Sequence, residues 1–247
     1  MEETINTRAI ILNSNPYRES DTLITVFSLD FGRLSLVVRG AKKISSKMAG
    51  HLEPMTIAKI MIIKGRGFSY VGGALGEKSF LAIREDLNKL FYAGKIMALF
   101  SSLVKENEKD ERLFSLLSRY LELIDEEKEF NKDLGELFFL RFSLSFLKET
   151  GYQPELNNCL ICQKKLMKGN NYFNLKDGGI ICPSCFEENM KNNEKKFSPA
   201  DVLTISNNCV IILRFLLDIE QKIKLKASKK IIKEASTLTK KFILYLK

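Results

Sequence analysis

The 247-residue sequence contains a single histidine, His51, and this scarcity limits the chemistry that the chain can perform. One histidine excludes most catalytic schemes that need a histidine base and most metal sites that need several histidines. The sequence also lacks a Gly-x-x-x-x-Gly-Lys-Ser/Thr loop and a Gly-x-Gly-x-x-Gly segment after a strand. We therefore expect a binding protein or adaptor rather than an enzyme, and we expect His51 to be structural.

Long apolar runs are also absent. The longest apolar stretches, at residues 137–147 and 209–217, are interrupted by Arg141 and Arg214. Neither reaches the roughly 20 residues that a helix needs to span a bilayer. The first residues, Met1-Glu2-Glu3, show no apolar signal region. We expect a cytoplasmic protein without a membrane partner.

Acidic side chains are scarce at both ends of the chain. Residues 1–80 carry 11 basic and 7 acidic side chains, and residues 191–247 carry 13 and 5. Residues 81–158 reverse the balance, with 11 basic and 15 acidic side chains. The net charge of the whole sequence is +9. A positive excess gathered at the ends indicates attraction to a polyanion such as nucleic acid. A genome biased toward lysine codons would give the same total without such a partner.

Cysteines are few, but four of the five form two Cys-x-x-Cys pairs. Cys159 and Cys162 precede Cys182 and Cys185, with nineteen residues between the pairs. This spacing is typical of a tetrahedral zinc site with four thiolates, and the closed coordination shell leaves no position for an activated water. We predict one structural Zn²⁺. Two disulfides or a redox pair are the alternatives, but an oxidising compartment and a βαβ pattern are not indicated. We interpret Cys209 as a small buried hydrophobe.

The first 80 residues have the pattern of a small closed β-barrel. Five short β-rich runs, separated by turns and without a long helix, lie at residues 7–12, 22–28, 33–38, 55–63 and 68–71. The segment after the third run is rich in cations and small residues, which is typical of a phosphate-binding loop, although a solvated loop is the alternative. The candidate phosphate contacts are Arg39, Lys42, Lys43 and Lys47, with Arg33 and Arg66 as further candidates, and Phe31, Phe68 and Tyr70 are candidate stacking surfaces.

From about Asp86 the apolar residues recur at helical spacing. A first helix is predicted to bury Leu87, Leu90, Phe91, Met97 and Ala98 on one face. Further helices are predicted over residues 113–121, over residues 133–151 as a helix buried nearly all round, from Ser198-Pro199 onward, and over residues 228–246. Between the cysteine pairs, a hairpin is predicted around Asp177-Gly178.

Several motifs resemble the bacterial recombination mediator family RecO. The chain has Tyr17-Arg18-Glu19-Ser20-Asp21 in the first turn, Val38-Arg39-Gly40-Ala41-Lys42-Lys43 in the basic loop, and His51-Leu52-Glu53-Pro54 before the next strand. The more specific match is Thr150-Gly151-Tyr152-Gln153-Pro154 leading into Cys159-x-x-Cys162, with Gly178-Gly179 before Cys182-x-x-Cys185. The resemblance covers nearly the whole chain.

The resemblance implies an α+β multidomain protein: an N-terminal OB-fold barrel (residues 1–80) and a helical body (residues 81–247) with a zinc finger at about residues 156–190. It implies binding of single- and double-stranded DNA, strand annealing, and cooperation with RecR to help RecA displace single-strand-binding protein, whose acidic C-terminal tail is an expected partner. Such a protein would be associated with the nucleoid. The main alternative is a zinc-ribbon adaptor for an acidic protein partner without direct DNA function; a metal-dependent enzyme is a second.

Overall fold

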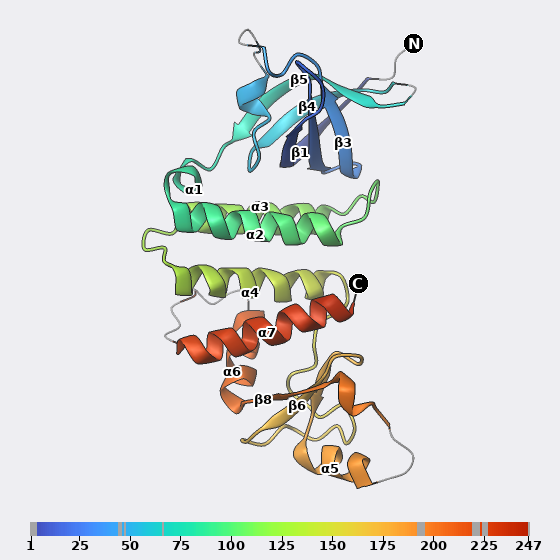
Figure 1. Ribbon diagram of the computed structural model, residues 1–247, viewed down its shortest axis with the longest axis vertical. Coiled ribbons are helices and arrows are strands. Elements are labelled where there is room, and N and C mark those ends of the chain that lie inside the picture. Colours follow the sequence, from blue (N-terminus) through green and yellow to red (C-terminus); the bar gives the residue numbers. More distant parts are fainter. Residues whose placement is uncertain are drawn as a thin grey trace. The chain divides into compact units, whose positions relative to one another are not determined.

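The computed structural model describes residues 4–43, 46, 48–65, 67–191, 196–218, 223 and 227–246. The chain divides into two compact units, Met1–Phe130 and Asn131–Lys247 (Figure 1). The first unit combines a β-sheet barrel with helices, and the second combines helices with a small three-stranded sheet. The protein is therefore of the mixed α+β class, with an N-terminal sheet followed by helices. In the described part of the chain, no helix is long and apolar enough to cross a membrane.

Five strands form the N-terminal barrel. They are β1 (Thr4–Pro16), β2 (Thr22–Ser28), β3 (Gly32–Val38), β4 (Ile57–Ile63) and β5 (Ser69–Lys78). The sheet closes in the order β1-β2-β3-β5-β4, with β4 paired to β1. All neighbours are antiparallel except β3 and β5, which pair in parallel at Leu36–Ser69 and Val37–Tyr70. The barrel predicted from the sequence is present, and its fifth strand is longer than predicted.

Strand β1 closes the barrel because it is long enough for two neighbours. Its first half pairs with β4, its second half pairs with β2, and the register with β2 shifts between Ile11 and Asn13. Side chains that alternate along the strands fill the interior, where burying apolar surface supplies most of the stabilisation. This core contains Ala9, Ile11, Ile24, Val26, Leu36, Val38, Leu52, Ala58, Ile60, Ile62 and Val71.

A glycine at the start of β3 allows the barrel to contact the segment around Glu108, which connects two helices of the same unit. Gly32 has φ +68°, and a Cβ atom there would lie 2.0 Å from the backbone oxygen of Glu108. The next residue accepts a backbone hydrogen bond, because the N–H of Asn107 donates to the oxygen of Arg33 over 3.0 Å. Only glycine fits this close approach between two backbones.

The described part of the first unit also contains a 3₁₀ turn, η1 (Ala49–His51), and three α-helices: α1 (Leu81–Glu85), α2 (Leu87–Leu103) and α3 (Glu111–Glu126). Asp86 begins α2 by accepting from the N–H groups of Asn88 and Lys89, and Asp110 caps α3 in the same way. The predicted buried face of α2 is confirmed at Met97 and is wrong at Leu87, Leu90, Phe91 and Ala98, which are exposed. The buried side chains of α2 are Lys89, Tyr92, Ala93, Ile96, Met97 and Phe100. The sequence signal failed there because α2 is apolar on both faces.

Three helices form the body of the second unit: α4 (Lys132–Glu149), α6 (Asn207–Leu217) and α7 (Lys229–Tyr245). Helix α4 packs against both α6 and α7 and is buried nearly all round from Leu137 to Leu147, as predicted. The carboxylate of Glu234 joins two of these helices, because it accepts hydrogen bonds from the backbone N–H and the hydroxyl of Ser206, the residue that caps α6. The predicted final helix agrees with α7 within about one residue at each end.

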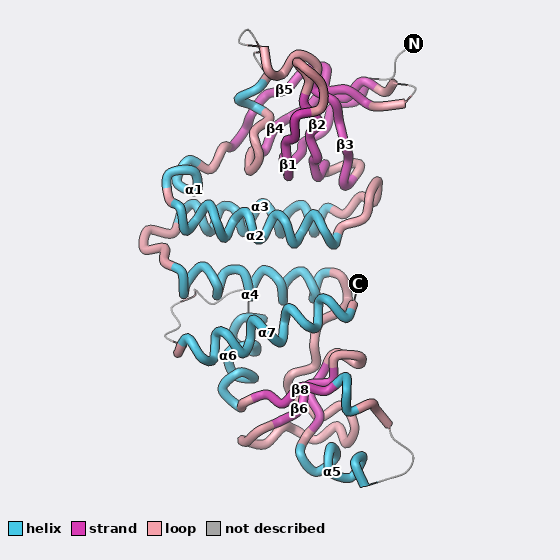
Figure 2. The backbone as a smooth tube through the Cα atoms, in the orientation of Figure 1, coloured by secondary structure: helices cyan, strands magenta, loops and turns pink. Residues whose placement is uncertain are grey.

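The described remainder of the second unit contains a small sheet, an α-helix and a 3₁₀ turn. Figure 2 shows the strands of this sheet in magenta. The sheet has the order β7-β6-β8 and contains β6 (Asn171–Asn174), β7 (Gly179–Ile181) and β8 (Val202–Ile205). The predicted hairpin corresponds to β6 and β7. The helix α5 (Pro183–Lys191) follows β7 directly. The helix predicted to begin at Ser198 is wrong, because Ser198 caps only the turn η2 (Pro199–Asp201), which leads into β8.

Candidate metal centre and candidate nucleic-acid interface

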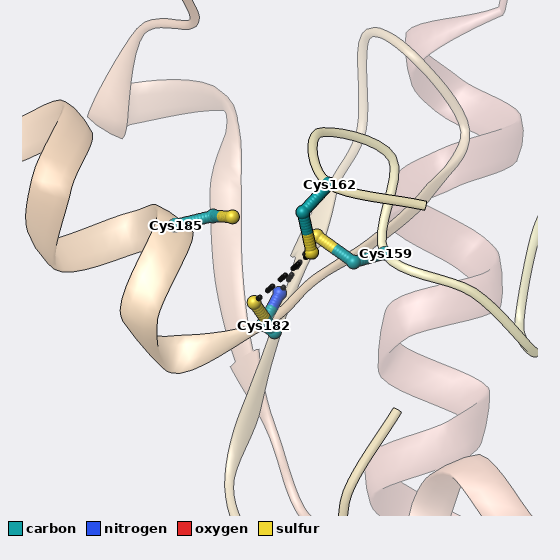
Figure 3. Close-up of side chains that lie close together, drawn as sticks. All are labelled: Cys159, Cys162, Cys182 and Cys185. Atoms are coloured by element: carbon teal, nitrogen blue, oxygen red, sulfur yellow. Dashed lines mark hydrogen bonds between the residues drawn. The ribbon is translucent and has the colours of Figure 1, made fainter. Parts of the chain in front are cut away.

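The four paired cysteines meet at one point of the second unit (Figure 3). Cys159 and Cys162 lie on the turn before β6, Cys182 follows β7, and Cys185 lies in the first turn of α5. Their sulfur atoms all lie within 4.8 Å of one another, and the Sγ atoms of Cys162 and Cys182 are 3.9 Å apart. A tetrahedral zinc with Zn–S bonds of about 2.3 Å separates its sulfurs by about 3.8 Å. All four thiols are free, so the arrangement can hold a metal ion.

Backbone hydrogen bonds hold the first cysteine pair in a tight turn. The N–H of Gln163 donates to the oxygen of Cys159 over 2.9 Å, and Gln163 takes a positive φ of 59° to close the turn. The sulfur of Cys159 accepts from the N–H of Ile161 and of Cys182 over 3.4 and 3.3 Å. A second link comes from Leu160, whose N–H donates to the oxygen of Ile180 in β7 over 2.8 Å. The two pairs are therefore positioned by their own backbones.

The thiol pKa values differ across the cluster. Burial opposes ionisation of Cys159, but the N–H groups that surround its sulfur lower its pKa to about 7. Burial raises the pKa of Cys182 and of Cys185, and the negative charge on Cys159 raises both further. Cys182 and Cys185 therefore resist ionising beside the Cys159 thiolate unless a cation lies between the sulfurs. A divalent metal supplies that cation, because a coordinated thiol is deprotonated outright.

Aromatic side chains and one glycine support the cluster. The rings of Tyr172 and Phe186 stack with centroids 3.8 Å apart, and Phe197 stacks on Phe186 at 5.9 Å. Gly179 is required in β7, because a Cβ atom there would lie 2.8 Å from Cδ2 of Leu160. These contacts fix β6, β7, α5 and the cysteine turn against one another.

The fifth cysteine lies apart from the cluster. Cys209 is fully buried in α6, and burial together with the nearby charge of Glu234 raises its pKa to about 12. This thiol stays protonated at neutral pH and packs as an apolar group, as predicted from the sequence. His51 is also structural, because its Nδ1 accepts a hydrogen bond from the N–H of Gly76 over 3.3 Å.

The basic loop after β3 is anchored to the turn between β1 and β2. The N–H of Gly40 donates to the carboxylate of Asp21 over 2.9 Å, and the N–H of Lys42 donates to the oxygen of Ser20 over 3.1 Å. Gly40 has φ +64°, which lets the loop turn back toward β2. The side chains of Arg39, Lys42 and Lys43 are exposed. Lys42 uses one of its three N–H donors for the oxygen of Arg18, at 2.9 Å.

Aromatic rings lie beside these cations. The guanidinium of Arg39 stacks over the ring of Tyr70 at 3.9 Å, and that of Arg18 lies over Tyr17 at 5.2 Å. Tyr17 contacts Phe68, with ring centroids 6.0 Å apart, and Phe68 is 51% exposed. We define the barrel patch as Tyr17, Arg18, Arg39, Lys42, Lys43, Phe68 and Tyr70. Sequence reasoning missed Tyr17 and Arg18 as candidates, although their place in a tight turn beside a proline was a usable signal.

The other predicted DNA contacts are placed differently. The guanidinium of Arg33 donates to the backbone oxygen of Ser101 over 3.0 Å and lies 4.0 Å from Glu106. Together with Phe31 and Phe68, it lines a cavity of about 550 Å³. Arg33 thus has partners inside its own unit. Lys47 and Arg66 lie outside the described residues.

Comparison with known proteins identifies the family. Two family models cover the chain: "Recombination protein O N terminal" matches residues 1–80, and "Recombination protein O C terminal" matches residues 84–246. The chain belongs to the RecO family. A RecO of Dehalococcoides mccartyi, described as DNA repair protein RecO, is 31% identical over 92% of this chain and 85% of its own length. The protein of the same description from Desulforamulus reducens is 30% identical over 96% of this chain and 87% of its own length.

Membership in the RecO family supports a role in DNA repair and recombination. It confirms the resemblance that the sequence motifs indicated. The four-cysteine cluster lies within the range that the C-terminal family model covers.

Proposed function

We propose that the protein is a DNA-binding recombination mediator. In this proposal, the barrel of residues 1–80 is an OB-fold that binds single- and double-stranded DNA, and residues 81–247 form the helical domain that carries the finger. The protein anneals complementary strands and, with RecR, helps to load RecA on DNA that is coated by single-strand-binding protein. It acts in the cytoplasm, at the nucleoid.

The barrel patch carries this proposal. Its cations neutralise phosphates and its rings offer stacking surfaces, the combination with which barrels bind single strands without a base code. The described loop residues Arg39, Lys42 and Lys43 are the proposed phosphate contacts. Arg33, Lys47 and Arg66 remain predictions, and Arg33 would have to leave its contacts with Ser101 and Glu106 to bind a phosphate.

We propose that Cys159, Cys162, Cys182 and Cys185 bind one zinc ion. The chemistry of the donor set supports this, because four thiolates in a tetrahedron select zinc or iron–sulfur chemistry over magnesium or calcium. Four protein ligands close the coordination shell, so the bound metal is structural. Metal analysis of the purified chain tests the assignment, and a zinc content far below one per chain would reject it.

A strand-annealing assay tests the function. Two complementary single strands are mixed with the protein, both bare and coated with single-strand-binding protein, and duplex formation is followed by fluorescence quenching. We expect the wild-type chain to accelerate annealing, and Lys42→Glu with Lys43→Glu to abolish most of the acceleration. A wild-type chain that binds single-strand-binding protein but does not anneal strands would favour the adaptor function and overturn the proposal.

A further inference from the structure

A second cluster of exposed cations lies beside the cysteine cluster. The segment of residues 163–170, which we name the knuckle loop, contains Lys164, Lys165 and Lys168 and no acidic residue. All three lysines are exposed, and Met167 between them is 82% exposed. Within the described ranges, no carboxylate lies within ion-pair distance of these three amines. The three lysine side chains therefore present positive charge to solvent without an ion-pair partner among the described residues.

The turn that places Cys159 also holds the knuckle loop. The N–H of Cys159 donates to the oxygen of Lys164 over 2.9 Å, and the N–H of Leu166 donates to the oxygen of Asn157 over 3.1 Å. Asn158 and Lys165 form an isolated antiparallel bridge between these two bonds. Farther along, the buried side chain of Asn171 donates to the oxygen of Gly169 over 3.2 Å. The backbone that carries the lysines is thus ordered before any ligand binds, which lowers the entropic cost of binding.

We infer that the knuckle loop is a second nucleic-acid contact, distinct in sequence and in compact unit from the barrel patch. Lys164, Lys165 and Lys168 bind backbone phosphates, and the exposed Met167 contacts sugars or bases. The charge of the loop indicates nucleic acid as its ligand, because three cations in a segment without carboxylates complement a repeating phosphate chain. The exposed apolar side chain of Met167 among them suits contact with a nucleic-acid groove or an unstacked base. The inference rests on the proposed function. In strand annealing, the knuckle loop would neutralise the phosphate charge of a second DNA strand while the barrel patch binds the first.

Salt dependence of duplex binding by the full-length protein tests this inference. The affinity for a fluorescent 20-base-pair duplex is measured by anisotropy from low to moderate salt, for the wild type and for Lys164→Ala, Lys165→Ala and Lys168→Ala combined. Each lost phosphate contact lowers the slope of log affinity against log salt by about 0.9. We expect the triple variant to lower the slope by about 2 to 3.

A matched triple variant controls for net charge. Lys132→Ala, Lys148→Ala and Lys240→Ala remove the same charge from exposed positions that are scattered over α4 and α7. We expect that variant to change the slope by less than one. Metal content and thermal unfolding of both variants show whether each retains the folded finger.

The outcomes separate this inference from the proposed function. A knuckle-loop variant that keeps its metal and the wild-type slope overturns the inference, and a reduced slope in Lys42→Glu with Lys43→Glu would leave the proposed function standing. If the knuckle-loop variant loses metal affinity but keeps the slope, the lysines only offset the negative charge of the metal-bound thiolates, which also overturns it. Binding of polyglutamate, a model of an acidic protein segment, is measured for the same variants. A knuckle-loop variant that no longer binds polyglutamate but keeps the wild-type salt slope for DNA would assign the loop to an acidic protein partner instead. If the wild-type chain binds no DNA, both the inference about the knuckle loop and the proposed function are overturned.

Discussion

Replacing Gly179 tests how closely β7 and the cysteine turn must pack. A Cβ atom at this position would lie 2.8 and 2.9 Å from Cδ2 and Cγ of Leu160 and 3.0 Å from Cβ of Glu155. Backbone hydrogen bonds to Ile180 hold both Leu160 and Glu155 beside β7, so the added methyl group is accommodated only by a shift of these side chains or of the turn that carries Cys159. Overpacking of this kind costs about 1–3 kcal/mol. We therefore predict that Gly179→Ala destabilises the second unit by that amount.

Because Leu160 is the neighbour of Cys159, we expect a shift of Leu160 to move Cys159 relative to Cys182, so that metal affinity falls with stability. If the whole cost of about 1–3 kcal/mol appears in metal binding, the affinity falls roughly five- to 150-fold. Metal affinity is measured by competition with a chromophoric chelator, and stability is measured by thermal unfolding, where each kcal/mol shifts the midpoint by about 3–6 °C. The matched control is Gly50→Ala, where an added Cβ meets nothing within 4 Å. Wild-type metal affinity and midpoint in Gly179→Ala would refute the reasoning.

Three further predictions follow from single contacts. The pKa of Cys159 is lowered from its ordinary value of 9.0 to about 7, so the stabilisation from its thiolate is fully present above pH 9 and is lost as the pH falls from 9 through 7. Because protons compete with the metal for the thiolates, we expect a chelator that leaves the metal in place at pH 8 to remove it at pH 5.5, and equal retention at both would contradict the assignment. Tyr70→Ala removes the ring under Arg39 and is expected to weaken single-strand binding by about 1–3 kcal/mol, roughly five- to 150-fold, in a titration where Tyr245→Ala has no effect. Asp86→Ala removes the side chain that caps α2 and is expected to destabilise the first unit by about 1 kcal/mol in denaturant unfolding.

The features that the sequence predicted well are local ones. The spacing of Cys159, Cys162, Cys182 and Cys185 predicted their convergence, because each Cys-x-x-Cys pair forms its own turn and a short hairpin returns the second pair to the first. The barrel strands were predictable because each is a short β-rich run bounded by turns. The sequence shows a glycine at position 179, but only the fold shows the contact with Leu160 that requires glycine there.

The features that could not be predicted depend on long-range contacts. Helix α2 is apolar on both faces, so its periodicity does not say that Leu87 and Phe91 are exposed while Ile96 and Phe100 are buried. Ser198-Pro199 is an equally good start for one 3₁₀ turn and for a long helix, and the pairing of β8 with β6 decides between them. The stacking in the barrel patch joins the β1–β2 turn, the loop after β3 and β5, which are separate in sequence.

The central claim is that cations beside aromatic rings on the barrel bind nucleic acid strands through phosphates. Single-strand affinity across a salt series, for the wild type and for Arg39→Ala, Lys42→Ala and Lys43→Ala combined, tests it most directly. Each lost contact to a single strand lowers the salt slope by about 0.7, so the account predicts a fall of about 2. A folded variant with the slope and affinity of the wild type would contradict it.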